Sequence, residues 1–124
     1  MKSKQTGKPK VFHYSKCSTC RKALAYLDAH DVDYELVDIV QTPPSKAELR
    51  RARELGGLPV QKLFNTSGQS YREGGFSARL PNLSESEALD ALAADGKLVK
   101  RPLVLGSDFA LVGFDPAAYA ARFG

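Results

Sequence analysis

The 124-residue sequence contains no tryptophan, one methionine, two histidines and only two cysteines. It has no apolar run close to the roughly 20 residues that a membrane-spanning helix needs, and the segment from Met1 to Lys10 lacks the apolar core of a signal peptide. These absences disfavour a disulfide-stapled secreted scaffold and a membrane protein. We therefore expect a cytoplasmic domain with no membrane partner, in which the cysteines carry chemistry rather than structural support.

The net charge of +4 is concentrated near the N-terminus, which has no acidic residue but contains Lys2, Lys4, Lys8 and Lys10. Without these lysines, the remaining basic and acidic residues balance, whereas a nucleic-acid groove needs a basic face on the folded body. We therefore expect no direct nucleic-acid partner. The prediction is a mobile basic tail over residues 1–9 and one domain over residues 10–124.

Apolar periodicity and capping signals predict the order of the elements. The expected strands are 10–14, 33–37, 102–105 and 110–114. The expected helices are 19–30, a helix capped by Ser45 with Glu48, a short helix from Pro59 to Phe64, a helix capped by Ser84 with Glu87 and closed by Gly96, and 117–123. A turn or cap is expected at 65–68. A βαβ half followed by a ββα half is a thioredoxin-like α/β arrangement with a mixed four-stranded sheet. Residues 42–96 would form a helical insertion between the halves.

Cys17 and Cys20 lie where an apolar strand gives way to a helical pattern, which places the first thiol at a helix N-terminus. The thiolate is the nucleophile, and an ordinary cysteine with a pKa of about 8.5 is mostly protonated at neutral pH. Unpaired N–H groups of the first helical turn, nearby cations and local hydroxyl donors lower that pKa. Cys20 is one turn further along and is placed to act as the resolving thiol. The residues expected to help are Lys16, Ser18, Thr19 and Arg21.

The cysteine pair has two alternative interpretations. One is half of a zinc site, but a second cysteine pair is absent, and the only further candidates are His13, beside a strand, and His30, far along the helix. The other is an ordinary buried pair, which the charged neighbours disfavour. We favour redox chemistry because strand, C-x-x-C and helix follow one another, and we expect no metal ligands.

A second candidate site is Lys100-Arg101-Pro102, directly before a predicted strand. Thioredoxin-like folds place a proline at this point, often in cis and facing the cysteine loop, so we expect a cis Arg101–Pro102 bond. An arginine beside a thiolate stabilises its charge and can bind an oxyanion. The alternative is a solvated arginine at the start of a strand.

These features together resemble the ArsC/Spx family of thioredoxin-fold proteins. The matching segments are 14–27, Asp38-Ile39 leading to Pro43-Pro44-Ser45, 64–73, Lys100-Arg101-Pro102 and 111–114. The resemblance implies that Cys17 matches the cysteine that attacks arsenate in the family's reductases. It also implies that Arg21 and Arg101 match arginines of those reductases, and that the electron donors are glutathione and glutaredoxin, with thioredoxin as a further candidate.

The chain departs from that pattern at the oxyanion site. The resemblance places Ser67 where the reductases have an arginine, and another arginine after the proline strand has no match. Lys62 or Arg72 are candidate substitutes. Each charge-assisted hydrogen bond is worth about 1.5–3 kcal/mol, so losing two arginines could weaken arsenate binding by orders of magnitude. Cys20 also stands where the usual reductase has serine.

The favoured hypothesis is a monomeric thiol-dependent oxidoreductase without a tightly bound cofactor, acting on a small oxyanion or thiol substrate with a redox partner protein. Cys17 is its nucleophile, Cys20 its resolving thiol, and Arg21 and Arg101 stabilise the thiolate. The alternative, implied by the resemblance, is an Spx-like redox-sensing regulator that binds the RNA polymerase alpha subunit. A glutaredoxin-type thiol–disulfide reductase is a third reading, which Ser18-Thr19 disfavours because such enzymes commonly have a proline or aromatic residue between the cysteines.

Overall fold

The computed structural model describes residues 8–124. Most of the predicted basic tail, residues 1–7, lies outside the described residues. Within them, the carbonyl of Pro9 accepts a hydrogen bond from the Glu35 N–H at 2.8 Å. The chain therefore joins the sheet just before its first strand.

The elements follow the predicted order, with shorter strands and additional short helices. The strands are β1 (Lys10–His13), β2 (Glu35–Asp38), β3 (Leu103–Leu105) and β4 (Ala110–Val112), and the helices are α1 (Ser18–Ala29), α2 (Lys46–Gly56), α3 (Gln69–Glu73), α4 (Phe76–Arg79), α5 (Glu85–Ala94) and α6 (Pro116–Phe123), with 3₁₀ turns η1 (Val60–Leu63), η2 (Leu80–Asn82) and η3 (Gly96–Leu98).

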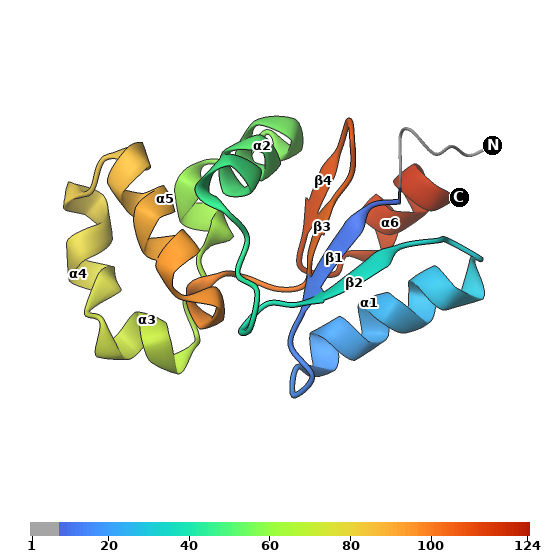
Figure 1. Ribbon diagram of the computed structural model, residues 1–124, viewed down its shortest axis with the longest axis horizontal. Coiled ribbons are helices and arrows are strands. Elements are labelled where there is room, and N and C mark those ends of the chain that lie inside the picture. The colour runs from blue at the N-terminus through green and yellow to red at the C-terminus, as the bar shows by residue number, and fades with distance from the viewer. Residues whose placement is uncertain (1–7) are drawn as a thin grey trace.

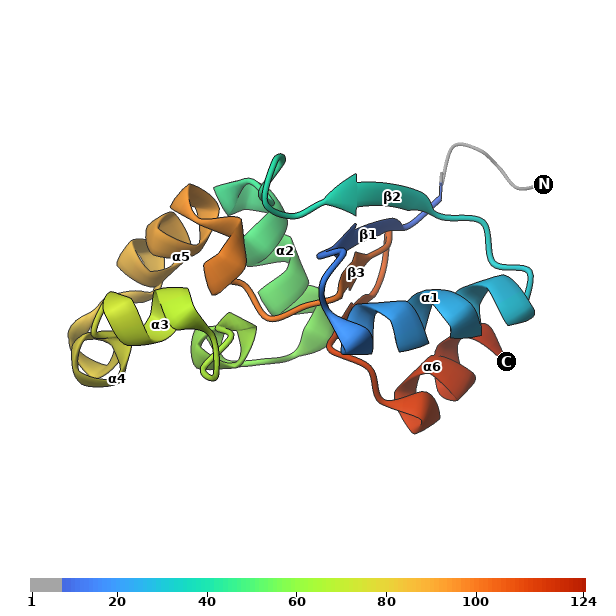
Figure 2. The same cartoon turned by 90° about the horizontal axis from the view of Figure 1, so that it is seen from below.

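The four strands form one mixed sheet in the order β2-β1-β3-β4. Strand β1 is parallel to β2 and antiparallel to β3, and β3 is antiparallel to β4. Helices α1 and α6 lie together on one side of this sheet, while α2 to α5 form a separate group on the other side (Figures 1 and 2). The predicted thioredoxin-like α/β architecture is confirmed.

Alternating strand residues contribute to two hydrophobic cores on opposite faces of the sheet, because successive side chains of a strand point to opposite sides. Val11 and Val104 pack with Ala23 and Leu27 of α1 and with Tyr119. Their neighbours Phe12 and Leu103 pack instead against the helical insertion. Strand β1 therefore lies between two buried layers, and this fixes the point at which the β1–α1 turn and its cysteines begin.

The predicted capping boxes both form. Ser45 accepts the Glu48 N–H while the Glu48 carboxylate accepts the Ser45 N–H, and Ser84 and Glu87 make the same reciprocal pair. Helix α2 ends at Gly56, and the next residue, Gly57, adopts the left-handed conformation with φ of 63°.

Two expectations about the insertion were wrong or incomplete. The predicted helix end at Gly96 is wrong: α5 ends at Ala94, and Gly96 begins η3, where the carbonyl of Ile39 approaches so closely that a Cβ would not fit. Helices α3 and α4 were not predicted, because neither is long enough to show an amphipathic period. No helix among residues 8–124 is long and apolar enough to cross a membrane.

Candidate active site

Cys17 is the N-cap residue of α1 and has an extended backbone conformation at the end of the turn that joins β1 to α1. The Cys17 N–H donates to the Tyr14 carbonyl at 3.0 Å, which closes this turn. The Cys17 side chain is half-buried, whereas Cys20, one helical turn on, is 1% exposed. The first thiol is thus accessible and the second lies beneath it.

The pKa of Cys17 is lowered from its ordinary value. Partial burial acts in the opposite direction and raises it, but the N–H of Cys20, the thiol of Cys20 and the N–H of Thr19 outweigh that effect, aided by the positive charge of Arg101. No N-cap hydrogen bond of standard geometry reaches the sulfur. The lowering of the Cys17 pKa therefore combines the first-turn N–H groups, the Cys20 thiol and the charge of Arg101.

The pKa of Cys20 is raised to about 12, mainly because burial disfavours its thiolate. The N–H of Tyr14 donates to the Cys20 sulfur at 3.4 Å and acts against this rise, while the adjacent Cys17 adds to it. The two thiols therefore have different tasks available to them. Cys17 can ionise and attack first, and Cys20 stays protonated until Cys17 has reacted.

Arg101 is distant from Cys17 in the sequence but lies near it in the structure, because it comes just before β3 and β3 begins beside the end of β1. Its guanidinium lies over the Tyr14 ring, 4.8 Å from the centroid, and donates to the Lys97 carbonyl at 3.0 Å. Its Nε is buried without a hydrogen-bond partner among the described residues. The Arg101–Pro102 bond is cis, as predicted.

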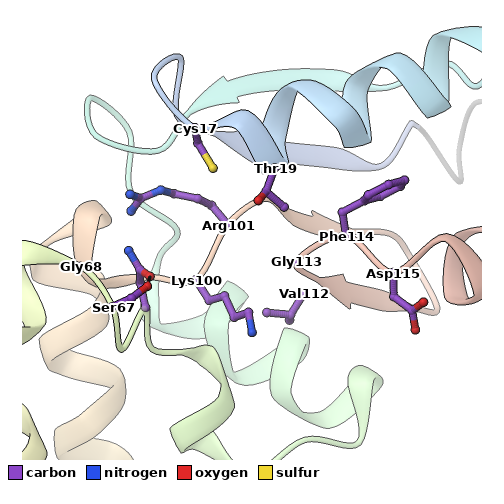
Figure 3. Close-up of a pocket in the computed structure, with 11 residues that line it drawn as sticks. Cys17, Thr19, Ser67, Gly68, Lys100, Arg101, Val112, Gly113, Phe114 and Asp115 are labelled. Carbon is purple, nitrogen blue, oxygen red and sulfur yellow. Dashed lines mark hydrogen bonds between the residues drawn. The ribbon is translucent and has the colours of Figure 1, made fainter.

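A cavity of about 630 Å³ opens beside Cys17. Figure 3 shows the Cys17 sulfur pointing towards Arg101 and Thr19, with the Ser67–Gly68 turn on one side and Lys100 below. The lining residues come from four segments, namely Cys17 and Thr19; Asn65, Ser67 and Gly68; Lys100 and Arg101; and Val112, Gly113, Phe114 and Asp115. The walls therefore combine an ionisable thiol, two cations and several hydrogen-bonding groups.

The structure brings some of the predicted site residues together. Cys17, Thr19, Ser67 and Arg101 line the cavity, and buried Pro102 adjoins Arg101. Thr19 acts on the Cys17 pKa through its main-chain N–H, not through the hydroxyl that the sequence suggested.

The other predicted residues do not line the cavity. Lys16, Ser18 and Lys62 are exposed outside it. Arg21 is exposed as well and donates to the Ser15 carbonyl at 3.2 Å. Arg72, a suggested substitute for the family arginine, donates to the Ser67 carbonyl at 2.8 Å and so supports the turn from outside. Arg101 is therefore the cation that acts on Cys17.

Sequence reasoning included Lys100 in the second candidate segment without giving it a role, and it assigned no site roles to Asn65, Gly68 or the segment 112–115. The sheet topology supplies the missing signal for Lys100 and for the segment 112–115. Strands β1 and β4 end, and β3 begins, at the same sheet edge, because β3 is antiparallel to both. Residues after β1 and β4 and before β3 must therefore meet there.

No group of three or more histidine, cysteine and acidic side chains that could hold a metal ion occurs among residues 8–124. His30 instead stacks on Tyr26, with ring centroids 3.9 Å apart, and its Nδ1 lies 2.9 Å from the Tyr26 carbonyl. Cys17 and Cys20 are both free thiols.

The pH dependence of alkylation tests this division of labour. The rate of iodoacetamide modification at Cys17 should rise with pH with a midpoint below the ordinary cysteine value, because the thiolate is the reactive form. Arg101→Met should move that midpoint upwards, since its charge favours the thiolate. Arg21→Met is the matched control and should move it less. A larger shift for Arg21→Met than for Arg101→Met would contradict the assignment.

Tyr119 supports the cavity wall from behind. Its buried hydroxyl donates to the Gly113 carbonyl at 3.0 Å, and the Gly113 N–H donates to the Pro102 carbonyl at 2.9 Å. Gly113 has a φ of 79°, a conformation that favours glycine. The wall opposite Cys17 is thus tied both to the cis-proline and to α6.

Tyr119→Phe should lower the free energy of unfolding by about 1 kcal/mol, because a hydrogen bond is lost and a buried carbonyl loses its donor. Urea denaturation measures the change. Tyr26→Phe is the matched control, since the buried Tyr26 hydroxyl has no partner among the described residues, and it should be neutral or stabilising. Equal losses for both variants would contradict the role given to the Tyr119 hydroxyl.

The sheet order, the cysteine pair at the start of α1 and the cis-proline beside it define a thioredoxin-like protein. The ArsC family model matches residues 12–122, and the chain belongs to the ArsC family. This confirms the family that the sequence motifs indicated.

Several relatives show the range of this family. YusI, an uncharacterized protein of Bacillus subtilis, is 45% identical over 83% of this chain and 87% of its own length. An arsenate reductase of Neisseria meningitidis serogroup A is 33% identical over 84% and 88%. A global transcriptional regulator Spx of Lactiplantibacillus plantarum is 25% identical over 80% and 74%.

Among solved structures, the crystal structure of an ArsC family related protein from Bacteroides fragilis has a TM-score of 0.89 and 43% identity, covering 94% of this chain and 98% of that one. The family relatives include both arsenate reductases and Spx-type regulators. They support a thiol oxidoreductase of this family without fixing its specific function.

Proposed function

We propose that this protein is a thiol-dependent oxidoreductase of the arsenate-reductase type. The observation that carries the proposal is the unequal cysteine pair: an accessible Cys17 with a lowered pKa above a buried Cys20 with a raised one. A structural pair would have no reason for this asymmetry, whereas a nucleophile followed by a resolving thiol needs it.

The chemistry proceeds in two displacements. The Cys17 thiolate attacks the arsenic of arsenate, forming an S–As bond and displacing hydroxide, or a sulfur of a disulfide, forming a new S–S bond and displacing a thiolate. Cys20 then attacks the Cys17 sulfur, its proton passing to the departing product. Two electrons reach the substrate and the pair becomes a disulfide. Arg101 stabilises the negative charge on Cys17 and on the entering substrate.

A thiol reductant must regenerate the pair. Glutathione with glutaredoxin, or thioredoxin, can supply two electrons, and we place the reaction in the cytoplasm, where such donors are kept reduced. No tightly bound cofactor is needed for these steps, because the cysteines themselves carry both electrons.

Turnover assays with each donor test the proposal. Purified protein should oxidise NADPH through glutathione and glutathione reductase, with and without glutaredoxin, or through thioredoxin and thioredoxin reductase, when arsenate or a small disulfide is added. Reduction of a disulfide but not of arsenate would retain the oxidoreductase and remove arsenate as substrate. Absence of turnover with every donor and substrate would refute the enzyme.

The second candidate is an Spx-like redox-sensing regulator that binds the RNA polymerase alpha subunit. It is favoured by Cys20, which makes a C-x-x-C pair, and by relatives named as Spx regulators. Immobilised alpha subunit should then capture the chain in one redox state and not in the other. Equal or absent capture of the oxidised and reduced forms would reject this candidate.

A further inference from the structure

The cavity beside Cys17 is much larger than a bare oxyanion requires. Its volume is about 630 Å³, within the range of about 300–1,000 Å³ that holds ligands of many atoms. One water occupies about 30 Å³ in the liquid, so an ion with five heavy atoms would fill only a small part. A substrate that reaches Cys17 therefore has room for a further portion that contacts the remaining walls.

Lys100 supplies an uncommitted charge on those walls. Its side chain is exposed and lines the cavity, and its ammonium makes no ion pair or hydrogen bond within residues 8–124. The main chain below it is fixed, since the Lys100 N–H donates to the Leu63 carbonyl at 2.7 Å. The Lys100 main chain is therefore fixed in place, while its ammonium remains available to a ligand.

Gly113 leaves space for this side chain. A Cβ built at Gly113 would lie 3.4 Å from the Lys100 Cε, and the φ of 79° also favours glycine there. Figure 3 shows Lys100 crossing the cavity floor towards Val112, pointing away from Cys17. The ammonium thus lies in a different part of the cavity from the reacting sulfur.

The two cations consequently differ in what they can do. Arg101 is held over Tyr14 by the Lys97 carbonyl and acts on the Cys17 charge. Lys100 has no such restraint. The other charged lining residue, Asp115, caps α6 by accepting the Ala117 N–H at 3.1 Å. The cavity floor therefore presents one free positive charge to whatever extends beyond the reacting atom.

We propose that the substrates of this site are small disulfides that carry a carboxylate, and that Lys100 binds that carboxylate. The inference rests on the proposed function and adds the substrate class. The Cys17 thiolate attacks one sulfur of the disulfide, forming a mixed disulfide and releasing one thiol. The first thiolate to leave takes a proton from water. Cys20 then attacks the Cys17 sulfur and gives its own proton to the second leaving thiolate, so that the substrate gains two electrons and two protons. A thiol reductant then restores the pair.

Three aliphatic disulfides of similar length test the charge preference: dithiodipropionate, which is dianionic; hydroxyethyl disulfide, which is neutral; and cystamine, which is dicationic. Pre-reduced protein is mixed with each disulfide without added reductant. The rate at which the protein's own cysteine thiols are lost is measured by rapid quenching and separation from the small thiols. Each rate is divided by the rate of the same disulfide with dithiothreitol, which removes differences in intrinsic reactivity. The wild type should prefer the compounds in the order given.

Lys100→Gln should lower the ratio of dithiodipropionate to hydroxyethyl disulfide about fivefold, the size expected for an exposed ion pair worth about 1 kcal/mol. Lys100→Arg should keep the ratio, because it keeps the charge. Lys22→Gln removes the same charge from an exposed position on α1 outside the cavity lining and should also keep it. Added salt should lower the ratio in the wild type more than in Lys100→Gln.

The possible outcomes separate the two proposals. If all three disulfides react at equal normalised rates, or if Lys100→Gln behaves as Lys22→Gln does, the substrate class is wrong while the oxidoreductase stands. If none of them oxidises the cysteine pair, the substrate class and the disulfide chemistry of the proposed function both fail. Far-ultraviolet circular dichroism of each variant establishes that it is folded.

Discussion

Cys17→Ser is expected to abolish reduction of any substrate, by more than about a thousandfold, because a serine hydroxyl does not ionise at neutral pH and the first displacement cannot begin. Cys20 cannot take over this step. Its side chain is 1% exposed and its pKa is raised to about 12, so both access and ionisation oppose attack. The same rate assay with a small disulfide measures the loss.

Cys20→Ser is the informative companion, because it should keep the first displacement and lose the second. In a single turnover without added thiol, the wild type should release two thiols per disulfide and show no adduct. Cys20→Ser should release one and gain the mass of the other half on Cys17, as intact-protein mass spectrometry would show. An adduct on Cys17→Ser, or release of both thiols by Cys20→Ser, would contradict the assigned roles.

The features that sequence predicted well depend on few neighbouring residues. The two capping boxes need only Ser45 with Glu48 and Ser84 with Glu87, and both form. At the last helix, Asp115 accepts the Ala117 N–H and Pro116 takes the first helical position. Because these signals are local and the strands are apolar, the order of elements and hence the fold class could be predicted.

The stretch between η1 and α5 was not predictable in the same way. Helices α3 and α4 are shorter than two turns, and Gly74 and Gly75 separate them. Contacts between residues distant in sequence hold them, including the aromatic group of Phe64, Tyr71 and Phe76. Such tertiary packing overrides local propensity, and nothing in the pattern of these residues shows it.

The site residues also differ in how well the sequence alone could predict them. Lys16 and Arg21 were candidates because they adjoin the cysteines in sequence, yet neither lines the cavity, and Arg21 is bonded to Ser15. Arg101 was found from its place before a proline and a strand, a topological argument. Lys100, one residue earlier, belongs to the same candidate segment, but sequence reasoning assigned it no role of its own. Only the structure shows that its ammonium has no partner within residues 8–124.

Ser67→Arg is expected to increase the efficiency of arsenate reduction about tenfold. Ser67 lines the cavity beside Cys17, and its carbonyl is fixed by Arg72, so a longer cationic side chain would start from a supported turn. A charge-assisted hydrogen bond to a multiply charged oxyanion is worth about 1.5 kcal/mol at the lower end of its range, which is close to a factor of ten. The exposure of Ser67 is the reason for taking the lower end.

Thr66→Arg is the matched control, because Thr66 adjoins Ser67 but does not line this cavity and faces a separate one with Tyr71 and Leu80. The kcat/KM for arsenate with a fixed donor measures both variants. Protection of Cys17 from iodoacetamide by arsenate reports binding alone, independent of turnover. Similar gains for the two variants would mean that added surface charge attracts the ion without a site. No gain in either measurement for Ser67→Arg would show that this position does not reach a bound oxyanion, and the substrate would then be sought among the larger ligands that the cavity admits.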